Sequence, residues 1–478
     1  MNQQTSLSTP LFAPINLKKL DSKNIVTAIQ YQLLINTNLT LLEYDKNTNL
    51  VTLLAEDYQI KGKTITFSIK KGIKTISGYE ITGKDAEISL RRLIFSKGSH
   101  SRLAELLCTQ KCNYGVSSKD YFLTIEAKNE SYIPFILSLL TNADTVIYPA
   151  IAFDSESPDS KVISLMETSG PYYFNVKSIE DVALDKFELA LNKTHPFSRP
   201  GLAEKVNYIV TTNEKAFNQG GLIAPFNYVH NVVGVRNKYL KMIDNNSDTF
   251  TIYRTVPIKN TLLFSTKEGR SRFTAEELTY FQQKIKDHLL QSSEYPEITS
   301  PQIEYFPEGS DGKLTPEQME KLIHFYERTR LYKTHEDKKI KLGLYKIMYE
   351  RYHKIFSNLN NVTVVQLTGS PLEVNHDDVD LYLTVIDSSF KESLDLLEYN
   401  KTFGLFKISD NDMSNYINSS NKNDRIKLIQ KIHLESLLSG YCLIIGSSPY
   451  TTILANDWEA SPSTLSAGYP VWKIKTKN

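Results

Sequence analysis

The sequence has little cysteine, no long uninterrupted hydrophobic run and almost no net charge. Three cysteines among 478 residues are too few for a disulfide scaffold. The longest stretch without a charged residue, 436–456, contains Gly440, Gly446 and Pro449, so we expect two buried strands around a turn and no transmembrane span. Because 55 Lys and Arg offset 54 Asp and Glu, the composition argues against nucleic acid as a partner.

The remaining composition is that of a globular protein, with 41% apolar and 23% charged residues. A chain of this length exceeds what one hydrophobic core usually holds, so two or three packed lobes are expected. The N-terminal stretch MNQQTSLSTPLFAPINLKKL lacks the basic start and apolar centre of a signal peptide. Two interpretations stay open: a cytoplasmic protein, or a mature form whose leader was removed.

Local patterns predict strands and helices in alternation. Strict alternation of apolar and polar residues in KTITFSIK predicts a half-buried strand at 63–70. Thr82 stands three residues before Asp85, which is typical of a helix start, so a helix is expected within a residue or two of Gly83. Further helices are expected after Thr274, after Thr315, over the amphipathic stretch 337–356 and through NDRIKLIQKIHLESLL, and further strands at NVTVVQL and Leu381–Val385. This mixture predicts an α/β fold.

Signatures of common enzymes and metal sites are missing from the sequence. It contains neither a G-x-S-x-G nucleophile elbow nor a G-x-x-x-x-G-K-[ST] phosphate loop. His335 and Glu336 begin like a zinc protease helix, but Lys339 stands where the second His is needed. Cys108 and Cys112, four residues apart in an apparently helical run, fit a metal or redox pair or two small buried side chains, and we favour the second interpretation. We predict no catalytic residue, no metal and no cofactor.

One acidic cluster offers ligands for a cation. His376, Asp377, Asp378 and Asp380 in NHDDVDLYL lie within five residues of one another and would suit a metal or an amine. The alternative, which we favour, is a solvated turn that leads into the strand at Leu381.

The most informative stretch of the sequence runs from Leu54 to Arg92. It reads LAE, then IKKGIK from Ile69, then ITGKDAEISLRR, and a second landmark is TSGPY at 168–172. These segments resemble the dipeptide and oligopeptide solute-binding proteins of ABC importers, family 5 of the extracellular solute-binding proteins. That family shows L-A-E-S-W, L-R-K-G-V-K-F-H-D-G, L-T-A-E-D-V-x-x-S-L-R-R and G-T-G-P-Y. The resemblance continues in LDSKN…LLEYD and NDRIKLIQKIHLE, and is weak between Phe217 and Gln366.

The resemblance implies a clamshell of the periplasmic-binding-protein type, with two ligand lobes and a small inserted domain. The first lobe would comprise 1–43, 163–255 and 447–478, the small domain 44–162, and the second lobe 256–446. Such proteins capture peptides or related small solutes by hinge closure, without catalysis, and deliver them to an ABC importer permease. A monomer is implied, located in the periplasm or otherwise outside the cytoplasm, with a lipid anchor as one option.

The resemblance also implies ligand-binding residues. In the family a peptide lies between the lobes as an added strand and an Asp holds its amine. Counting without gaps places the first-lobe segment at Val26, Thr27 and Ala28. In the second lobe the family reads L-T-G-W-x-A-D-Y, whereas this chain has LTVIDSSF, with Ser389 at the Asp and Phe390 at the Tyr. Asp387, two residues earlier, is the candidate amine anchor.

Two other classes of function stay open at this point. Relatives with this fold also form ligand-sensing domains of transcriptional regulators or receptors. An unrecognised enzyme is the third interpretation, and it depends only on the cluster from His376 to Asp380.

Overall fold

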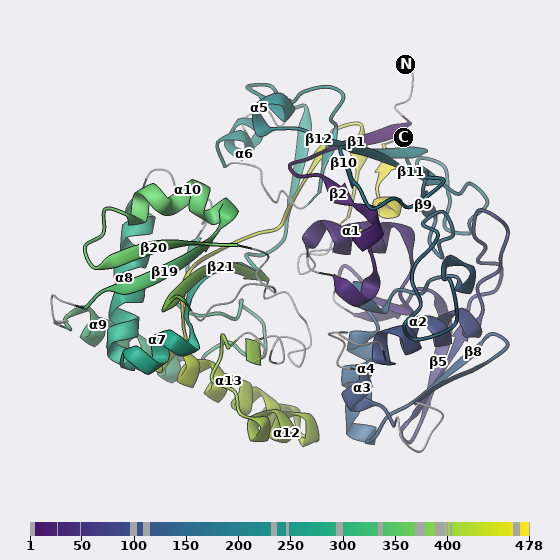
Figure 1. Ribbon diagram of the computed structural model, residues 1–478. Helices are drawn as coiled ribbons and strands as arrows, with labels where there is room; N and C mark the ends of the chain where they lie inside the picture. The colour runs from purple at the N-terminus through teal and green to yellow at the C-terminus, as the bar shows by residue number, and fades with distance from the viewer. Residues whose placement is uncertain are drawn as a thin grey trace. The chain divides into compact units, whose positions relative to one another are not determined.

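The computed structural model divides the chain into two compact units (Figure 1). Unit 1 comprises Met1–Thr255 and Thr451–Asn478, and unit 2 comprises Val256–Tyr450. The structure describes residues 5–25, 27–47, 49–95, 103–108, 115–230, 237–244, 248–292, 300–332, 338–368, 378–387, 397, 400–401, 404–461 and 469–477. Among these residues no helix is both long and apolar enough to cross a membrane.

The first sheet of unit 1 joins the N-terminus to the middle of the chain. Its strand order is β1 (Ser6–Leu11), β12 (Lys205–Val210), β11 (Lys186–Leu191) and β9 (Tyr172–Phe174). Only the β1–β12 pair is parallel. The helix α1 (Ala28–Thr37) packs near this sheet, with Asn36 Nδ2 donating to Tyr208 Oη at 3.0 Å.

A second, smaller sheet of unit 1 combines strands that precede unit 2 in the sequence with one that follows it. Its order is β15 (Tyr228–Val229), β23 (Thr451–Ala455) and β16 (Phe250–Arg254), and Arg254 lies opposite Thr451. Beside it lie α5 (Asn213–Ala216), β13 (Phe217–Asn218), β14 (Gly221–Leu222) and α6 (Asn237–Asp244), which share one hydrophobic cluster with it. The chain therefore leaves unit 1 after β16 and returns to it at the adjacent strand.

The third sheet of unit 1 contains the segment that carries the family resemblance. Its order is β5 (Ala55–Lys61), β6 (Thr64–Ile69), β8 (Phe122–Glu126) and β7 (Val116–Lys119), and α2 (Gly83–Phe95) packs on β7 and β8. Alternate residues of β6 are buried, which confirms the predicted half-buried strand. The start of α2 at Gly83 is also confirmed, because Asp85 accepts a hydrogen bond from the Thr82 backbone N–H at 2.7 Å.

Short elements complete unit 1. The short strand pairs are β2 (Ile15–Asn16) with β10 (Ala183–Leu184), β3 (Leu42–Tyr44) with β4 (Leu50–Thr52), and β24 (Trp458–Glu459) with β25 (Lys475–Thr476). The short helices are α3 (Leu103–Leu106) and α4 (Ile133–Leu139), with 3-10 turns at Leu17–Lys19, Ser22–Asn24, Glu130–Tyr132, Ala143–Thr145, Ala150–Ala152 and Val471–Lys473.

Unit 2 is built on one mixed sheet of six strands. Its order is β18 (Ser300–Pro301), β22 (Cys442–Ser448), β17 (Lys259–Ser265), β21 (Leu381–Asp387), β19 (Ile340–Tyr345) and β20 (Val362–Leu367). The strands β21, β19 and β20 are parallel, and β17 runs antiparallel to β21 and β22. A bulge at Ile445 interrupts the β17–β22 register.

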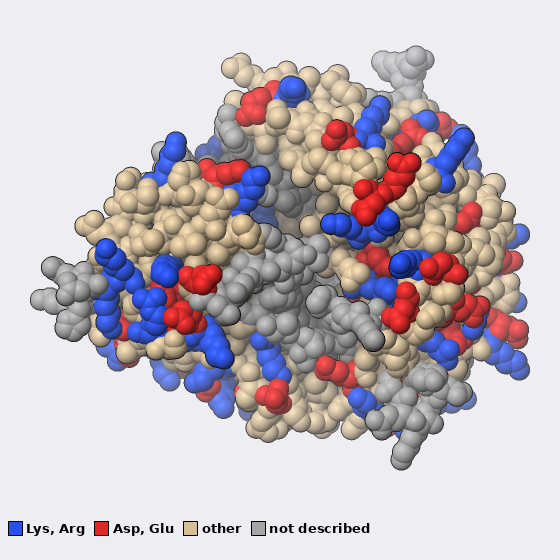
Figure 2. Space-filling model, viewed as in Figure 1, with Lys and Arg blue, Asp and Glu red and all other residues tan. Residues whose placement is uncertain are grey.

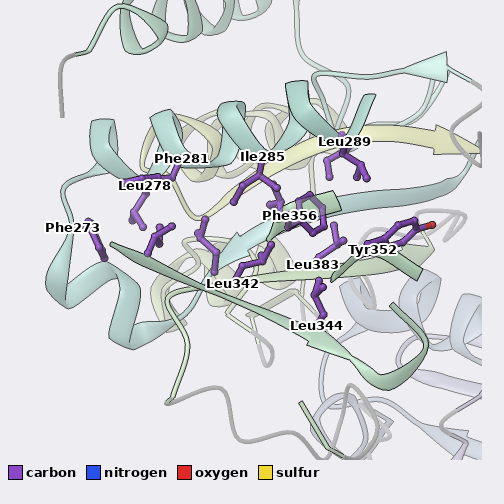
Figure 3. Close-up of a cluster of buried hydrophobic side chains, with 14 residues drawn as sticks. Phe273, Leu278, Phe281, Ile285, Leu289, Leu342, Leu344, Tyr352, Phe356 and Leu383 are labelled. Atoms are coloured by element: carbon purple, nitrogen blue, oxygen red, sulfur yellow. The ribbon is translucent and has the colours of Figure 1, made fainter. Parts of the chain in front are cut away.

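Helices cover the sheet of unit 2 and close its core. They are α7 (Lys267–Arg272), α8 (Ala275–Gln291), α9 (Pro316–Arg330), α10 (Lys346–Phe356), α12 (Asp410–Asn418) and α13 (Lys422–Leu438). Figure 3 shows α8 above the sheet, with Phe281 and Ile285 pointing toward Leu342 and Leu383 of the central strands. All four side chains are fully buried. This core fixes the positions of β19 and β21.

Most predicted elements of unit 2 are confirmed, and one is wrong. Thr274 and Thr315 cap α8 and α9 through capping boxes, and α13 lies where predicted. The two buried strands expected in 436–456 are β22 of unit 2 and β23 of unit 1. The predicted helix over 337–356 is wrong in its first half, which forms β19. The alternation in IKLGLY has a period of two, and Gly343 admits close packing because a Cβ there would lie 2.7 Å from Leu367 Cδ1.

Cys108 does not lie in a helix. The helix α3 ends at Leu106, and Leu107 forms an isolated bridge with Ala127. The expected helical run through Cys108 is therefore wrong. Cys112 lies outside the described residues, so the proposed pairing is not tested.

The three-part division of the chain stays a prediction. The small domain predicted at 44–162 includes the sheet of β5, β6, β8 and β7, but the contacts of the chain separate only the two units described above.

Candidate functional site

A candidate ligand-binding surface lies within unit 2, at the carboxyl end of β19. From β19 the chain passes through α10 to β20 on one side, and the next strand, β21, lies on the other side of β19. The connections therefore diverge between β19 and β21. In open α/β sheets, ligands bind at such a switch point, outside the carboxyl ends of the strands.

Within the described part of the chain, one edge of β21 is paired over only part of its length, and the unpaired part is called the open edge here. β21 pairs with β17 along its whole length, from Leu381 opposite Ser265 to Asp387 opposite Lys259. It pairs with β19 only at Leu381 and Tyr382. Among the described residues, no strand pairs with the β19-facing edge of 383–387. Unpaired backbone N–H and C=O groups of this kind accept an additional strand.

The side chains beside this edge are aromatic, hydroxylated and apolar. The ring of Tyr345, at the end of β19, lies edge-on to the ring of Tyr382, with centroids 4.7 Å apart. The hydroxyl oxygens of Tyr345 and Thr384 are 3.5 Å apart. Val385 is 38% exposed, which is unusual for a β-branched residue in a central strand. Val385 and Thr384 point to opposite faces of the sheet, so a strand added at this edge would contact Val385 on one face and the partly buried Tyr345 ring on the other.

In unit 1, the predicted site residues lie at the start of α1. Thr27 is the N-cap, and its Oγ1 accepts the Gln30 N–H at 3.3 Å while Gln30 Oε1 accepts the Thr27 N–H at 3.1 Å. Thr27 and Ala28 are exposed. A helix leaves its first N–H groups without intrahelical acceptors, so this end can donate hydrogen bonds to a carbonyl or carboxylate oxygen.

Two buried amide side chains of α1 form hydrogen bonds with the C-terminal segment. Gln32 Nε2 donates to Tyr469 O at 2.7 Å, and Asn36 Oδ1 accepts the Val471 N–H at 3.0 Å. The C-terminal segment therefore fixes the orientation of the helix whose first turn is exposed.

The remaining predicted site residues are only partly described. Asp387 is the last residue of β21, so its backbone ends the open edge, but its side chain lies outside the description. Val26, Ser389 and Phe390 also lie outside the described residues. The assignment of Val26, Thr27, Ala28, Asp387, Ser389 and Phe390 to a ligand site stays a prediction.

Asp380, the last residue of the acidic cluster, has a structural role. This side chain is fully buried, and Arg272 Nη1 donates to both of its carboxylate oxygens, at 2.7 and 3.0 Å. The Lys341 N–H also donates to Asp380 Oδ2 at 2.8 Å. The favoured solvated turn is therefore wrong for Asp380, because a paired carboxylate ties α7 to β19 and β21 instead.

The described residues of the acidic cluster do not support a metal site. His376 and Asp377 lie outside the described residues, and Asp378 is exposed. Among the described residues, no group of three His, Cys, Asp or Glu side chains is arranged to hold a metal ion.

Two buried titratable groups of unit 2 form hydrogen bonds with backbone atoms. Lys286 Nζ donates to Gln302 O and Ile444 O, each at 2.7 Å, and burial lowers its pKa to about 8. His433 accepts the Tyr305 N–H at Nε2 and donates from Nδ1 to Gly312 O, both at 3.0 Å. Burial lowers the pKa of His433 to about 4, so it is neutral at pH 7.

Sequence reasoning missed Tyr345 and Val385 as candidate ligand contacts. Both depend on where β19 ends and on how far it pairs with β21. The alternation in IKLGLY followed by a helical pattern was the available signal for Tyr345. For Val385 no signal was available, because exposure of one residue in a central strand follows from a register that only the structure gives.

Charges of both signs are mixed on the visible surface. Figure 2 shows Lys and Arg interspersed with Asp and Glu over the described residues of this face in both units. Over the described residues of this face, neither sign of charge forms a single large patch.

Solved structures show which fold this is. The *Escherichia coli* murein tripeptide binding protein MppA is similar over 100% of this chain and 99% of its own, with a TM-score of 0.76 and 14% identity. NikA from *Brucella suis*, in complex with Fe(III)-EDTA, is similar over 99% and 100%, with a TM-score of 0.74 and 12% identity. *Haemophilus influenzae* OppA, complexed with RPPGFSPFR, covers 100% and 99%, with a TM-score of 0.72 and 11% identity.

These likenesses span the whole chain and define its fold as that of the solute-binding proteins, with mixed α/β units. No protein-family model matches the sequence, and no curated protein matches it.

Proposed function

We propose that this chain is the solute-binding component of an ABC importer and that it binds a peptide or a related small solute without catalysis. The observation that carries the proposal is the open edge of β21 at the switch point of the unit 2 sheet. The fold, shared over the full length with solute-binding proteins, supports it.

The open edge favours an extended ligand. A peptide that adds to β21 as a strand exchanges main-chain hydrogen bonds with it, and such bonds do not depend on the ligand's side chains. Tyr345 and Val385, beside the edge, would then select among ligands. A permease as partner, a monomeric state and a location outside the cytoplasm, with or without a lipid anchor, belong to the same proposal.

Retention of peptides by the purified chain tests the proposal. A tryptic peptide pool is incubated with the protein, unbound peptide is removed, and retained peptide is identified by mass spectrometry after denaturation. We expect the chain to retain peptides. In calorimetry with one retained peptide, Val385→Lys should bind it at least roughly 10-fold more weakly than the unsubstituted chain, because a lysine on a strand edge disfavours pairing with an added strand.

The control is Val182→Lys, a 45% exposed valine in unit 1, which should retain the same peptides as the unsubstituted chain. Absence of any retained peptide, or equal affinity of Val385→Lys and Val182→Lys, would contradict peptide binding at β21.

Asp387 is proposed to hold the amine of a peptide ligand. Calorimetry of Asp387→Ala with a retained peptide and with its N-acetylated form tests this role. A loss of affinity for the free-amine peptide alone supports the role, and unchanged affinity for both removes Asp387 from the site.

A further inference from the structure

The strand β5 is an edge strand of the third sheet of unit 1, and one side of it is unpaired in the described part of the chain (Figure 1). The N–H of Ala55 donates to Leu41 O at 3.2 Å, so the unpaired part begins after Ala55. From there to Lys61 every residue except Tyr58 is exposed. An unpaired edge of this kind is a site at which another strand can add.

The hairpin of β5 and β6 determines which backbone groups point outward. Its turn has two residues, 62–63, and Lys61 pairs with Thr64 across it. Residues that flank such a turn exchange hydrogen bonds, and bonded and non-bonded pairs then alternate along the two strands. The N–H and C=O groups of Tyr58 and Ile60 therefore point away from β6.

The carboxylate of Asp57 covers part of this edge. Its Oδ1 accepts the Tyr58 N–H at 2.8 Å, which confirms that this N–H points away from β6. The bond is local and exposed, so a backbone acceptor can replace it at little cost. The Tyr58 C=O and both backbone groups of Ile60 have no backbone partner among the residues that the structure describes.

The sequence of β5 is complementary to itself in one antiparallel register. With Gln59 of two copies opposite each other, Tyr58 of one copy pairs with Ile60 of the other, and each such pair exchanges both N–H···O bonds. Asp57 then lies opposite Lys61 of the other copy, and twofold symmetry repeats this pair. Ile60 is 46% exposed, so the register covers an exposed apolar side chain and places opposite charges face to face.

Neighbouring registers fit less well. Placing Tyr58 opposite Tyr58 brings Lys61 opposite Ala55, whose N–H is already bonded to Leu41 O. The opposite shift brings the turn at 62–63 into the pairing. Only the register centred on Gln59 therefore uses the whole unpaired edge and no residue outside it.

We infer that β5 joins two copies of this chain in a twofold-symmetric dimer. The edge 57–61 is short and buries less than the about 1,000 Å² of a stable interface, so the dimer is weak and depends on concentration. The monomer of the proposed function is the dilute form of this equilibrium. Since β5 belongs to unit 1 and the open edge of β21 to unit 2, the inference does not depend on ligand binding.

Sedimentation of the full chain at low salt, from about 10 µM to about 1 mM, measures the association. We expect the average mass to rise with concentration from monomer toward dimer. Asp57→Lys and Lys61→Asp each place like charges opposite one another, so each should weaken the dimer at least about 10-fold. The control Asp248→Lys makes the same charge change at an exposed position outside this sheet and should associate like the unsubstituted chain.

Mixing the two variants tests the partner and the register together. One variant then carries only lysines and the other only aspartates at the two pairing positions, so an equimolar mixture should form dimers at concentrations where neither variant does alone. Thermal unfolding of each variant checks that it is folded.

Three results would overturn the inference: an unsubstituted chain that stays monomeric up to about 1 mM, single variants that associate as strongly as it does, or a mixture that stays monomeric. Peptide retention by Asp57→Lys and Lys61→Asp should be unchanged, which separates this inference from the proposed function.

Discussion

The two units differ in what their most recognisable residues do. In unit 1 several of the residues that match family landmarks are buried, and Arg92 is one of them. Arg92 is 1% exposed, and its Nη2 donates to Asp21 Oδ2 at 2.7 Å and to Ser160 O at 2.8 Å. In unit 2 the candidate ligand surface includes the exposed Val385, which departs from the Gly of the family pattern. The residues that identify the fold and the candidate ligand residues of unit 2 thus lie in different units.

The largest expected effect comes from substituting Arg92, a residue of unit 1 that matches the family pattern. Arg92 also stacks on Phe153, with the guanidinium 4.0 Å from the ring centroid. Because Arg92→Met leaves Asp21 without its buried partner, we expect a loss of about 3–5 kcal/mol in the free energy of unfolding. Urea unfolding measures it, with the exposed Arg199→Met as control at under about 0.5 kcal/mol. An equal effect of the two substitutions would contradict the structural role of Arg92.

The next test compares buried histidines, one in each unit. His195 in unit 1 donates from Nε2 to Ser169 O at 2.9 Å and accepts the Phe197 N–H at Nδ1, and burial lowers its pKa to about 4. His433 in unit 2 has the opposite tautomer and the same lowered pKa. Both should be neutral at pH 7.

A folded pKa of about 4 against 6.5 unfolded means that stability is complete above pH 6.5 and is lost as the pH falls toward 4. Each histidine should contribute about 3 kcal/mol to that loss. His433→Gln should therefore reduce the acid dependence of unit 2, and His195→Gln that of unit 1, in urea unfolding at pH 7, 6 and 5. If the stability of either variant falls with pH as steeply as that of the natural chain, protonation of that histidine ring does not destabilise the fold.

The smallest expected effect concerns Lys286, a buried lysine of unit 2. Its pKa is lowered to about 8, so the unfolded chain binds more protons than the folded chain above pH 8. Relative to Lys286→Met, the free energy of unfolding of the natural chain should rise by about 1 kcal/mol per pH unit from pH 8 to 10. Parallel pH profiles for the two proteins would contradict the lowered pKa.

Sequence patterns predicted the fold better than the site. Capping at Thr82, Thr274 and Thr315 is local, so it can be identified from residues three positions apart. The open edge of β21 depends on where pairing with β19 stops, and that register pairs residues far apart in the sequence, such as Leu342 with Leu381. The first half of the 337–356 segment was misassigned because its apolar residues fit both a helix and a strand over so short a length.

The pairing of Arg254 with Thr451 has a consequence for how the chain is assembled. β16 and β23 are antiparallel neighbours, and all of unit 2 occupies the position that a hairpin loop would take between them. A two-residue Asn-Gly turn joining Arg254 to Thr451 would complete that hairpin without altering its register. In genetic terms, unit 2 is one continuous coding segment inserted between two neighbouring strands of unit 1, and its removal would leave every strand of the unit 1 sheets encoded.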